Sequence, residues 1–470
     1  MGMRTTIIML AAAFATPAQA ASLDGSALVW PWALPFTGLL LTIAAGPTLF
    51  AGLWHAHYGK IAALWAALAF VPIVLIYGIA TAMEALTHAL LGEFLSFIVV
   101  LFALYTVAGG IVVTGSLRGT PLVNTAMLAF GAGIASIVGT TGAAMILIRP
   151  VIRANAERKH RAHVIVFFII LVANVGGALT PLGDPPLFIG FLRGVDFFWP
   201  ARHLWLQTAI VVALVLAIFL VVDASLQRGE PTRATETGTE PLRVRGVVNL
   251  ALIVLVICAT LLSAAWKPGV SFSLVGTKLE LQNLARDGAL IVIALFSLWL
   301  TPEEHRAANG FTWEPIAEVA KLFAAIFVAI TPVLAMLQAG HRGPFAALLT
   351  AVTMNDGRPH QVAFFWLSGI LSAFLDNAPT YLVFFELAGG NAAELMGPLA
   401  GTLAAISMGA VYMGALSYIG NAPNFMIYAI AEERGIRMPS FLAYFAWASL
   451  ILLPLFLLLT FLPIAPMFPD

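Results

Sequence analysis

Apolar residues form long runs along nearly the whole chain, separated by short polar stretches. A helix that crosses a bilayer needs a run of about 20 apolar residues. We identify ten such spans, five in each half of the chain, at residues 31–54, 60–84, 93–115, 162–193, 203–223, 246–266, 286–301, 312–339, 397–431 and 441–464. The pattern predicts an all-α polytopic membrane protein.

Two further apolar stretches, residues 121–151 and 360–388, are interrupted near their middles. Each is predicted to be a re-entrant helical hairpin, which enters and leaves the membrane on one side. The positive-inside rule favours this topology, because only a hairpin keeps the basic loop after residues 121–151 in the cytoplasm. The basic residues there are Arg149, Arg153, Arg158, Lys159 and Arg161.

The odd number of spans in each half predicts two repeats of inverted topology. Residues 21–223 form the first repeat, with hairpin 121–151 opening to the cytoplasm. Residues 246–470 form the second repeat, with hairpin 360–388 opening to the periplasm. Residues 224–245 form a cytoplasmic linker rich in Thr, Glu, Gly and Pro. This topology places the mature N-terminus and the C-terminus in the periplasm, in a bacterial-type inner (plasma) membrane.

Residues 1–20 have the pattern of a signal peptide. Arg4 supplies the positive charge, Thr5–Ala15 the short apolar core, and Ala18-Gln-Ala20 the cleavage site. The alternative is a leader that stays uncleaved.

The composition agrees with a bilayer location and excludes several functions. Hydrophobic residues make up 61% of the chain and charged residues 10%, too few charges to cover a soluble domain. The formal net charge is zero, so no nucleic-acid partner is expected; the expected partners are the lipid bilayer and small inorganic ions. A single cysteine, Cys258, excludes a disulfide within the chain. Hydrolase motifs such as H-E-x-x-H and G-x-S-x-G are absent, so we expect no enzyme.

Two short segments, Thr180–Pro186 and Ser417–Pro423, are near copies that interrupt apolar runs with glycine and proline. Each follows another interrupted segment by almost the same distance. Thr140 lies 43 residues before the glycine of the first copy, and Asp376 lies 44 residues before that of the second. Broken helices at matching places in two halves indicate the substrate site of a secondary transporter.

Asp184 and Asp376 are the only carboxylates that we place deep in the membrane, one in each half. An aspartate at the centre of a spanning helix costs about 2.5–3.5 kcal/mol on insertion scales, which indicates a functional use. Protons and Na⁺ compete for the oxygens of a buried carboxylate, and that competition is sufficient for exchange. In the alternative interpretation, each aspartate only caps the helix that follows it.

Hydroxyl, amide and backbone oxygens near these acids suit Na⁺ rather than a soft metal. We expect no resident cofactor, and Na⁺ bound at Asp184 and Asp376. Glu318, Lys321 and Glu386 are assigned to the membrane interface, and no Arg or Lys is placed at depth to hold an anion. The candidate ion-binding and proton-coupling residues besides the aspartates are Thr140, Thr141, Asn174, Thr180, Gly183, Asn377, Ser417, Asn421 and Asn424.

Three motifs resemble the ion transporter superfamily, whose fold is that of citrate transporters, and most closely its NhaD-type sodium/proton antiporters. They are GTTGAAMILIRP at Gly139–Pro150, NVGGALTPLGDPP at Asn174–Pro186 and SAFLDNAPT at Ser372–Thr380. The resemblance implies inverted repeats, an elevator mechanism and a homodimer. It also implies that Asp184 and Asp376, with the Thr140–Thr141 tip, handle the ions.

We therefore predict a secondary active transporter that exchanges Na⁺ or Li⁺ for H⁺. The first alternative is a Na⁺- or H⁺-coupled carrier of citrate or another small anion, because related members of the superfamily carry such substrates. The dicarboxylate carriers of this superfamily have Ser-Asn-Thr at both hairpin tips, whereas this chain has Gly-Thr-Thr-Gly and Asp-Asn-Ala-Pro. Arsenite efflux is a weaker alternative, since neutral arsenite would need no pair of acids.

Overall fold

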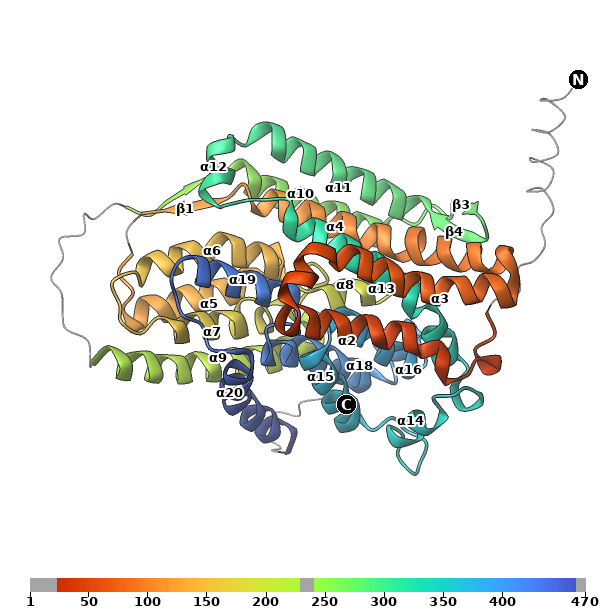
Figure 1. Cartoon of the computed structure of the whole chain (residues 1–470). Helices are drawn as coiled ribbons and strands as arrows, with labels where there is room; N and C mark the ends of the chain where they lie inside the picture. Colours follow the sequence, from red (N-terminus) through yellow and green to blue (C-terminus); the bar gives the residue numbers. More distant parts are fainter. Residues whose placement is uncertain (1–22, 116, 229–240, 462–470) are drawn as a thin grey trace, which may run out of the picture.

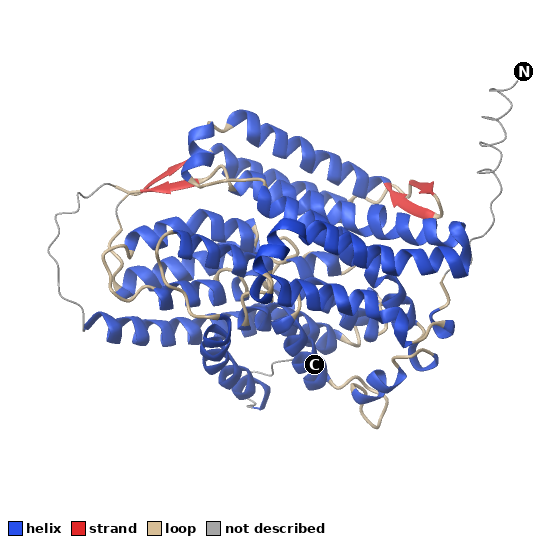
Figure 2. Ribbon diagram, in the orientation of Figure 1, coloured by secondary structure: helices blue, strands red, loops and turns tan. Residues whose placement is uncertain are grey.

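The computed structural model describes residues 23–115, 117–228 and 241–461. It is built almost entirely of helices (Figures 1 and 2). Seven helices in these residues are long and apolar enough to cross a membrane, so the chain is an all-α polytopic membrane protein. The predicted signal peptide, residues 1–20, and residues 229–240 of the predicted linker lie outside the described residues.

The first half of the chain, with the end of the linker, contributes the following elements. The helices are α2 (Leu34–Leu49), α3 (Ala51–Thr87), α4 (Leu95–Ala108), α5 (Pro121–Val138), α6 (Thr140–Ala154), α7 (Ala162–Leu171), α8 (Pro185–Leu192) and α9 (Trp199–Arg228). The other segments are the π-helical η3 (His88–Phe94) and strands β1 (Val112–Thr114) and β2 (Arg243–Arg245).

The second half contributes the remaining helices and one β-hairpin. They are α10 (Val248–Ala265), β3 (Ser271–Leu274), β4 (Thr277–Glu280), α11 (Leu281–Leu300), α12 (Glu303–Ala308), α13 (Glu314–Gln338), α14 (Ala346–Ala351), α15 (Gln361–Phe374), α16 (Asn377–Leu387), α17 (Ala392–Met396), α18 (Ala400–Met413), α19 (Ala422–Glu433) and α20 (Phe441–Phe461). The antiparallel pairs β1–β2 and β3–β4 lie at opposite ends of the molecule (Figure 2).

The two interrupted apolar stretches are pairs of helices that pack on each other. Gly139, with φ 81°, joins α5 to α6, and Leu375–Asp376 joins α15 to α16. The positive φ at the first tip suits glycine, which has no Cβ to clash there. These two tips lie where the sequence pattern predicts them.

The region between residues 51 and 108 differs from the prediction. We expected a loop near residues 85–92, but α3 continues through η3 into α4. The break instead lies at Gly78, whose φ of 86° and ψ of 162° are not helical. Glu93, at the start of the predicted span 93–115, is buried in the structure in a contact with Arg193.

The helices divide into two packed groups, and both halves of the chain contribute to each. The six-helix group consists of α2, α3, α4, α10, α11 and α13. The hairpin group consists of α5–α9 and α15–α20. In Figure 1, α4, α10 and α11 lie along one side of the molecule, while α9 and α20 lie along the other. The halves are therefore interleaved, and the hairpin group holds both pairs of broken helices.

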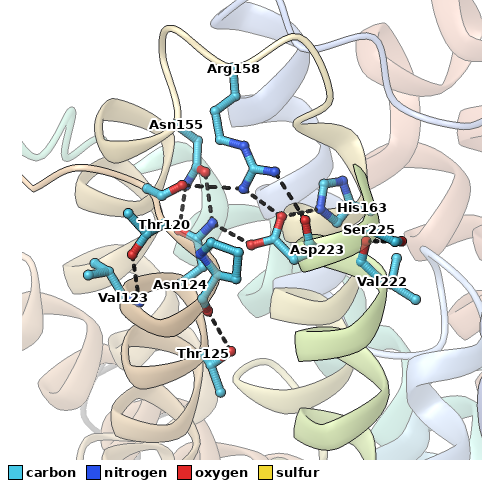
Figure 3. Close-up of polar contacts among 12 residues, drawn as sticks. Thr120, Val123, Asn124, Thr125, Asn155, Arg158, His163, Val222, Asp223 and Ser225 are labelled. Carbon is cyan, nitrogen blue, oxygen red and sulfur yellow. Dashed lines mark hydrogen bonds and ion pairs between the residues drawn. The ribbon is translucent and has the colours of Figure 1, made fainter. Parts of the chain in front are cut away.

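A buried polar cluster ties the base of the first hairpin to α7 and α9 (Figure 3). The carboxylate of Asp223 lies 2.5 Å from Arg158 and 2.8 Å from His163. It also accepts a hydrogen bond of 2.9 Å from the amide of Asn124, which exchanges hydrogen bonds with Asn155 at the end of α6. The cluster joins these elements into one unit.

Candidate functional site

Four helices of the hairpin group begin at one place. Helix α6 starts at Thr140, while Asp184, Asp376 and Asn421 each precede the first residue of α8, α16 and α19. Helices α6 and α19 pack on each other, and so do α8 and α16. Helix N-termini carry partial positive charge, so this convergence favours negative groups.

Each hairpin tip is bonded to the unwound segment of its own half. The N–H of Thr140 donates to the carbonyl of Gly183 over 2.8 Å, and the N–H of Asn377 donates to that of Gly420 over 3.2 Å. Asn377 follows Thr140 by the same number of residues as Gly420 follows Gly183, so the two hydrogen bonds are equivalent in the two halves. A Cβ at Gly183 would lie 2.1 Å from the carbonyl oxygen of Gly177, so only glycine fits this approach.

The same offset shows that the two aspartates are not equivalent. The position that corresponds to Asp184 is Asn421, and the position that corresponds to Asp376 is Gly139, because 421 − 184 and 376 − 139 also equal 377 − 140. One carboxylate therefore comes from a helix break and the other from a hairpin tip. The two acids therefore do not occupy equivalent positions in the two halves.

Asp184 occupies the N-cap position of α8, but its side chain makes no capping hydrogen bond. The next two residues, Pro185 and Pro186, have no N–H to donate. The interpretation of Asp184 as a simple helix cap is therefore wrong, and its carboxylate is available to other segments.

The carboxylate of Asp184, 1% exposed, accepts hydrogen bonds from three neutral side chains. The hydroxyl of Thr140 and the amide of Asn421 reach Oδ1 over 3.1 and 2.9 Å. The amide of Asn377 reaches Oδ2 over 2.6 Å. No basic side chain of the described residues forms an ion pair with Asp184, and the three side chains that donate hydrogen bonds to it are all neutral.

Asp376 has a more exposed position at the tip of the second hairpin. Its Oδ1 accepts the N–H of Ala378 over 3.0 Å, so Asp376 does cap α16. The residue is half-buried and lines the same cavity as Asp184. Capping occupies one carboxylate oxygen of Asp376, and it does not remove the residue from the cavity.

Two amide oxygens beside Asp184 lack partners. Asn377 Oδ1 and Asn421 Oδ1 are buried without a hydrogen-bond partner in the described part of the chain, although both Nδ2 groups donate to the aspartate. A buried polar atom without a partner is costly and requires an explanation. Flipping either amide about its Cβ–Cγ bond would exchange nitrogen for oxygen and present an acceptor to a cation held by Asp184.

The side chain of Asn421 belongs to a hydrogen-bonded network of amides. Asn421 donates to Asn174 Oδ1 over 3.3 Å, and Asn174 donates to Asn424 Oδ1 over 2.8 Å. Asn424 donates in turn to the carbonyls of Gly414 and Ser417 over 2.9 and 2.8 Å. Asn174 and Asn424 thus position Asn421 and do not contact Asp184 themselves.

Three other predicted residues have different surroundings. The hydroxyl of Thr180 donates to the carbonyl of Ser136, and Ser417 Oγ accepts the N–H groups of Ile419 and Gly420 over 3.2 and 3.0 Å. Both side chains therefore stabilise the unwound backbone. Thr141 lines the cavity next to Thr140.

A cavity of about 550 Å³ opens from the site between the two helix groups. It runs along α6, α13 and α19, and the first half of α8 contributes Pro185 and Phe188 to its lining. The predicted site residues that line it are Thr140, Thr141, Gly183, Asp184, Asp376 and Asn421.

Five acidic or basic residues of this cavity were not predicted as site residues: His55, Arg149, Glu314, Glu318 and Glu433. Glu318 was assigned to the interface, but it faces the cavity. Arg149 lines the cavity from α6, is 9% exposed, and its Nε has no partner among the described atoms. Its position on the same helix as Thr140 was the available signal.

Comparison with known families gives the context of this geometry. Residues 25–464 match the family model described as "Putative citrate transport". The chain belongs to this citrate transporter family. A transporter, and not an enzyme, is therefore the class of protein that the family indicates.

Two mycobacterial proteins are similar to this chain in sequence. Uncharacterized transporters of Mycobacterium bovis and Mycobacterium tuberculosis are each 24% identical to it over 330 residues. The match covers 68% of this chain and 71% of each relative. Their names agree with transport and specify no substrate.

Proposed function

We propose that this member of the citrate transporter family exchanges Na⁺ or Li⁺ for H⁺, with Asp184 as the shared binding group. The observation that carries the proposal is the buried carboxylate of Asp184, which has neutral donors and no basic partner among the described residues. A buried carboxylate in such surroundings needs a proton or a cation to neutralise it. Either one must leave before the other binds.

The oxygens around Asp184 have the chemistry of a Na⁺ site. The hydroxyl of Thr140 and the unpartnered amide oxygens of Asn377 and Asn421 are hard neutral ligands. With Na⁺ bound, the two amides would turn their oxygens toward the ion. With a proton on Asp184, one carboxylate oxygen becomes a donor and the amides keep their present roles.

The charge of the cavity also favours cations. Its lining includes the five carboxylates of Asp184, Glu314, Glu318, Asp376 and Glu433, against a single arginine. A cleft lined mainly by one sign of charge concentrates ions of the opposite sign.

The proposed cycle uses the two helix groups. The cavity extends toward Arg149, and the basic loop that follows this residue supports a cytoplasmic opening at that end. Na⁺ replaces the proton there, the hairpin group then moves against the six-helix group, and protons displace Na⁺ in the periplasm. Inverted repeats, elevator motion, inner-membrane location, periplasmic termini and a homodimer are parts of this proposal.

A second candidate is a cation-coupled carrier of citrate or a similar anion. Arg149 in the cavity and the four converging helix N-termini favour it, as does the description of the family. In this case Na⁺ or H⁺ at Asp184 would accompany the anion in the same direction.

Purified protein in liposomes with a pH-sensitive dye and an imposed pH gradient tests the two candidates. Na⁺, Li⁺, K⁺ and citrate are added in turn. We expect Na⁺ or Li⁺ alone to dissipate the gradient, and Asp184→Asn to abolish the response because the near-isosteric amide cannot release a proton. Asp376→Asn is expected to weaken it.

Asp356→Asn is the matched control, because this aspartate lies in an exposed loop and pairs with neighbouring Arg358. Exchange that persists in both Asp184→Asn and Asp376→Asn would contradict the site. A response to citrate without one to cations alone would support the second candidate.

A further inference from the structure

A buried arginine outside the cavity holds two carboxylates at once. Arg193 Nη1 lies 2.5 Å from Glu386 Oε1, and Nη2 lies 2.6 Å from Glu93 Oε1. Gln338 also donates to Glu386 over 3.2 Å. The side chains are mostly buried, with exposed fractions of 20% for Arg193, 12% for Glu93 and 2% for Glu386. Glu386, which the sequence assigned to the membrane interface, is therefore buried within the protein.

This cluster lies at the far ends of two helices that start at the site. Helix α8 leads from Asp184 to Arg193, and α16 leads from Asp376 to Glu386. At about 1.5 Å per residue, the cluster is about 14 Å from the aspartates. Since the cavity opens along α6 and α19, the cluster closes the opposite end of the site.

The two contacts of Arg193 connect different bodies. Arg193 and Glu386 both belong to the hairpin group, so their ion pair holds α8 and α16 together. Glu93 belongs to η3, which continues into α4 of the six-helix group. The pair Glu93–Arg193 is therefore a contact between groups.

The surroundings allow this second contact to open. A small cavity of about 130 Å³ is lined by Glu93, Arg193, His88 and Phe327, so the pair is not packed solid. His88, which is 61% exposed, lies 3.6 Å from Glu93 on the same segment η3 and stays beside that carboxylate when Arg193 leaves. Arg193 retains Glu386 when it leaves Glu93, which avoids the large cost of a buried charge without a partner.

We propose that the Glu93–Arg193 ion pair is a latch, which holds the hairpin group in the state with the large cavity open and is released when that group moves. Glu386 is the permanent partner that travels with Arg193. The latch rests on the alternating access of the proposed function, and it does not depend on which substrate is carried.

The test measures access to the cavity in membrane vesicles. Cys258 is replaced by Ser, and Met426, which lines the cavity on α19, is replaced by Cys. A membrane-impermeant maleimide is applied to inverted and to right-side-out vesicles. We expect Glu93→Gln to lower labelling from the cavity side by about fivefold and to raise it from the other side, because one partly buried ion pair biases the two states.

Asp196→Asn is the matched control. It removes an exposed ion pair with Arg202 that lies wholly within the hairpin group, so labelling should be unchanged. Arg193→Lys, which keeps the charge, should shift access less than Glu93→Gln. Unchanged labelling in Glu93→Gln, in a protein whose labelling responds to Na⁺ or pH, would overturn the latch. Labelling that never responds in the parent protein would instead contradict alternating access.

Discussion

The surroundings of Asp184 show which neutral residues bind this carboxylate, on which the proposed ion exchange depends. Thr140, Asn377 and Asn421 come from three other segments and donate hydrogen bonds to this carboxylate without adding charge. An arginine in their place would neutralise the carboxylate permanently and remove its affinity for Na⁺. The absence of a charged partner among the described residues is thus the feature on which exchange depends.

Asn377→Ala tests the contribution of one neutral ligand. The substitution removes the 2.6 Å donor to Asp184 Oδ2 and a candidate oxygen ligand, so we expect the KM for Na⁺ to rise about tenfold with exchange retained. Initial rates of exchange against Na⁺ concentration measure this. Asn391→Ala, which removes the exposed cap of α17, should leave KM unchanged; an equal rise in both variants would contradict a specific role.

The residues that bind Asp184 could be predicted from the sequence, but the other charged residues that line the cavity could not. Thr140, Asn377 and Asn421 lie in interrupted motifs, and breaks in apolar helices are visible along the chain. Arg149 and Glu318 lie on ordinary helical turns, and their direction depends on packing between the two groups. Sequence position alone placed Glu318 near a span end, which is compatible with either a lipid or a cavity environment.

At the scale of elements, the short helices α6, α8, α16 and α19 replace continuous spans. Proline and glycine make these breaks, and the carbonyls and N–H groups that they release bond to each other between Thr140 and Gly183 and between Asn377 and Gly420. These breaks were predictable because few other residues interrupt an apolar run. The helix through residues 85–92 was not, since the partner that buries Glu93 is 100 residues away.

The Asp223 cluster gives a prediction for the stability of the first hairpin. Asp223→Asn leaves the charge of Arg158 buried without its carboxylate and weakens the bond to His163, so we expect a loss of about 3 kcal/mol in unfolding free energy. Thermal unfolding of the purified protein in detergent measures the loss. Asp196→Asn, at an exposed pair, should cost under about 1 kcal/mol. Equal melting of both variants would show that the cluster does not hold the hairpin base.

At the scale of the whole molecule, each group is assembled from both halves. Helices α2–α4 pack with α10, α11 and α13, while α5–α9 pack with α15–α20. The proposed motion between the groups would therefore leave the site intact, because both hairpins and both broken helices would move together. It changes only the surface that the six-helix group presents to the site.

A cross-link between the groups tests this motion. A Cβ at Gly142 on α6 would lie 3.0 Å from the Cβ of Ala108 on α4, close to the spacing of about 3.5–4.5 Å in disulfides. With Cys258 replaced by Ser, we expect oxidation of Gly142→Cys with Ala108→Cys to stop transport and a reductant to restore it. Transport assays before and after reduction measure this.

The matched cross-link lies within the hairpin group. Gly194→Cys with Ala392→Cys joins two positions whose Cβ atoms would be 3.5 Å apart, with some strain at residue 194, where φ is +99°. This disulfide should leave transport running. Arrest by both cross-links, or by neither, would contradict a movement of the hairpin group as one body.

The imperfect correspondence between the two halves bears on the direction of transport. Two identical halves with inverted topology would make the inward-open and outward-open states degenerate in energy. In the proposed inverted topology Asp184 corresponds to Asn421 and Asp376 to Gly139, so the two states would differ in energy at the site itself. The affinity for the transported ion would then differ between the two faces of the membrane. Transport would be faster in one direction than in the other even without a regulator.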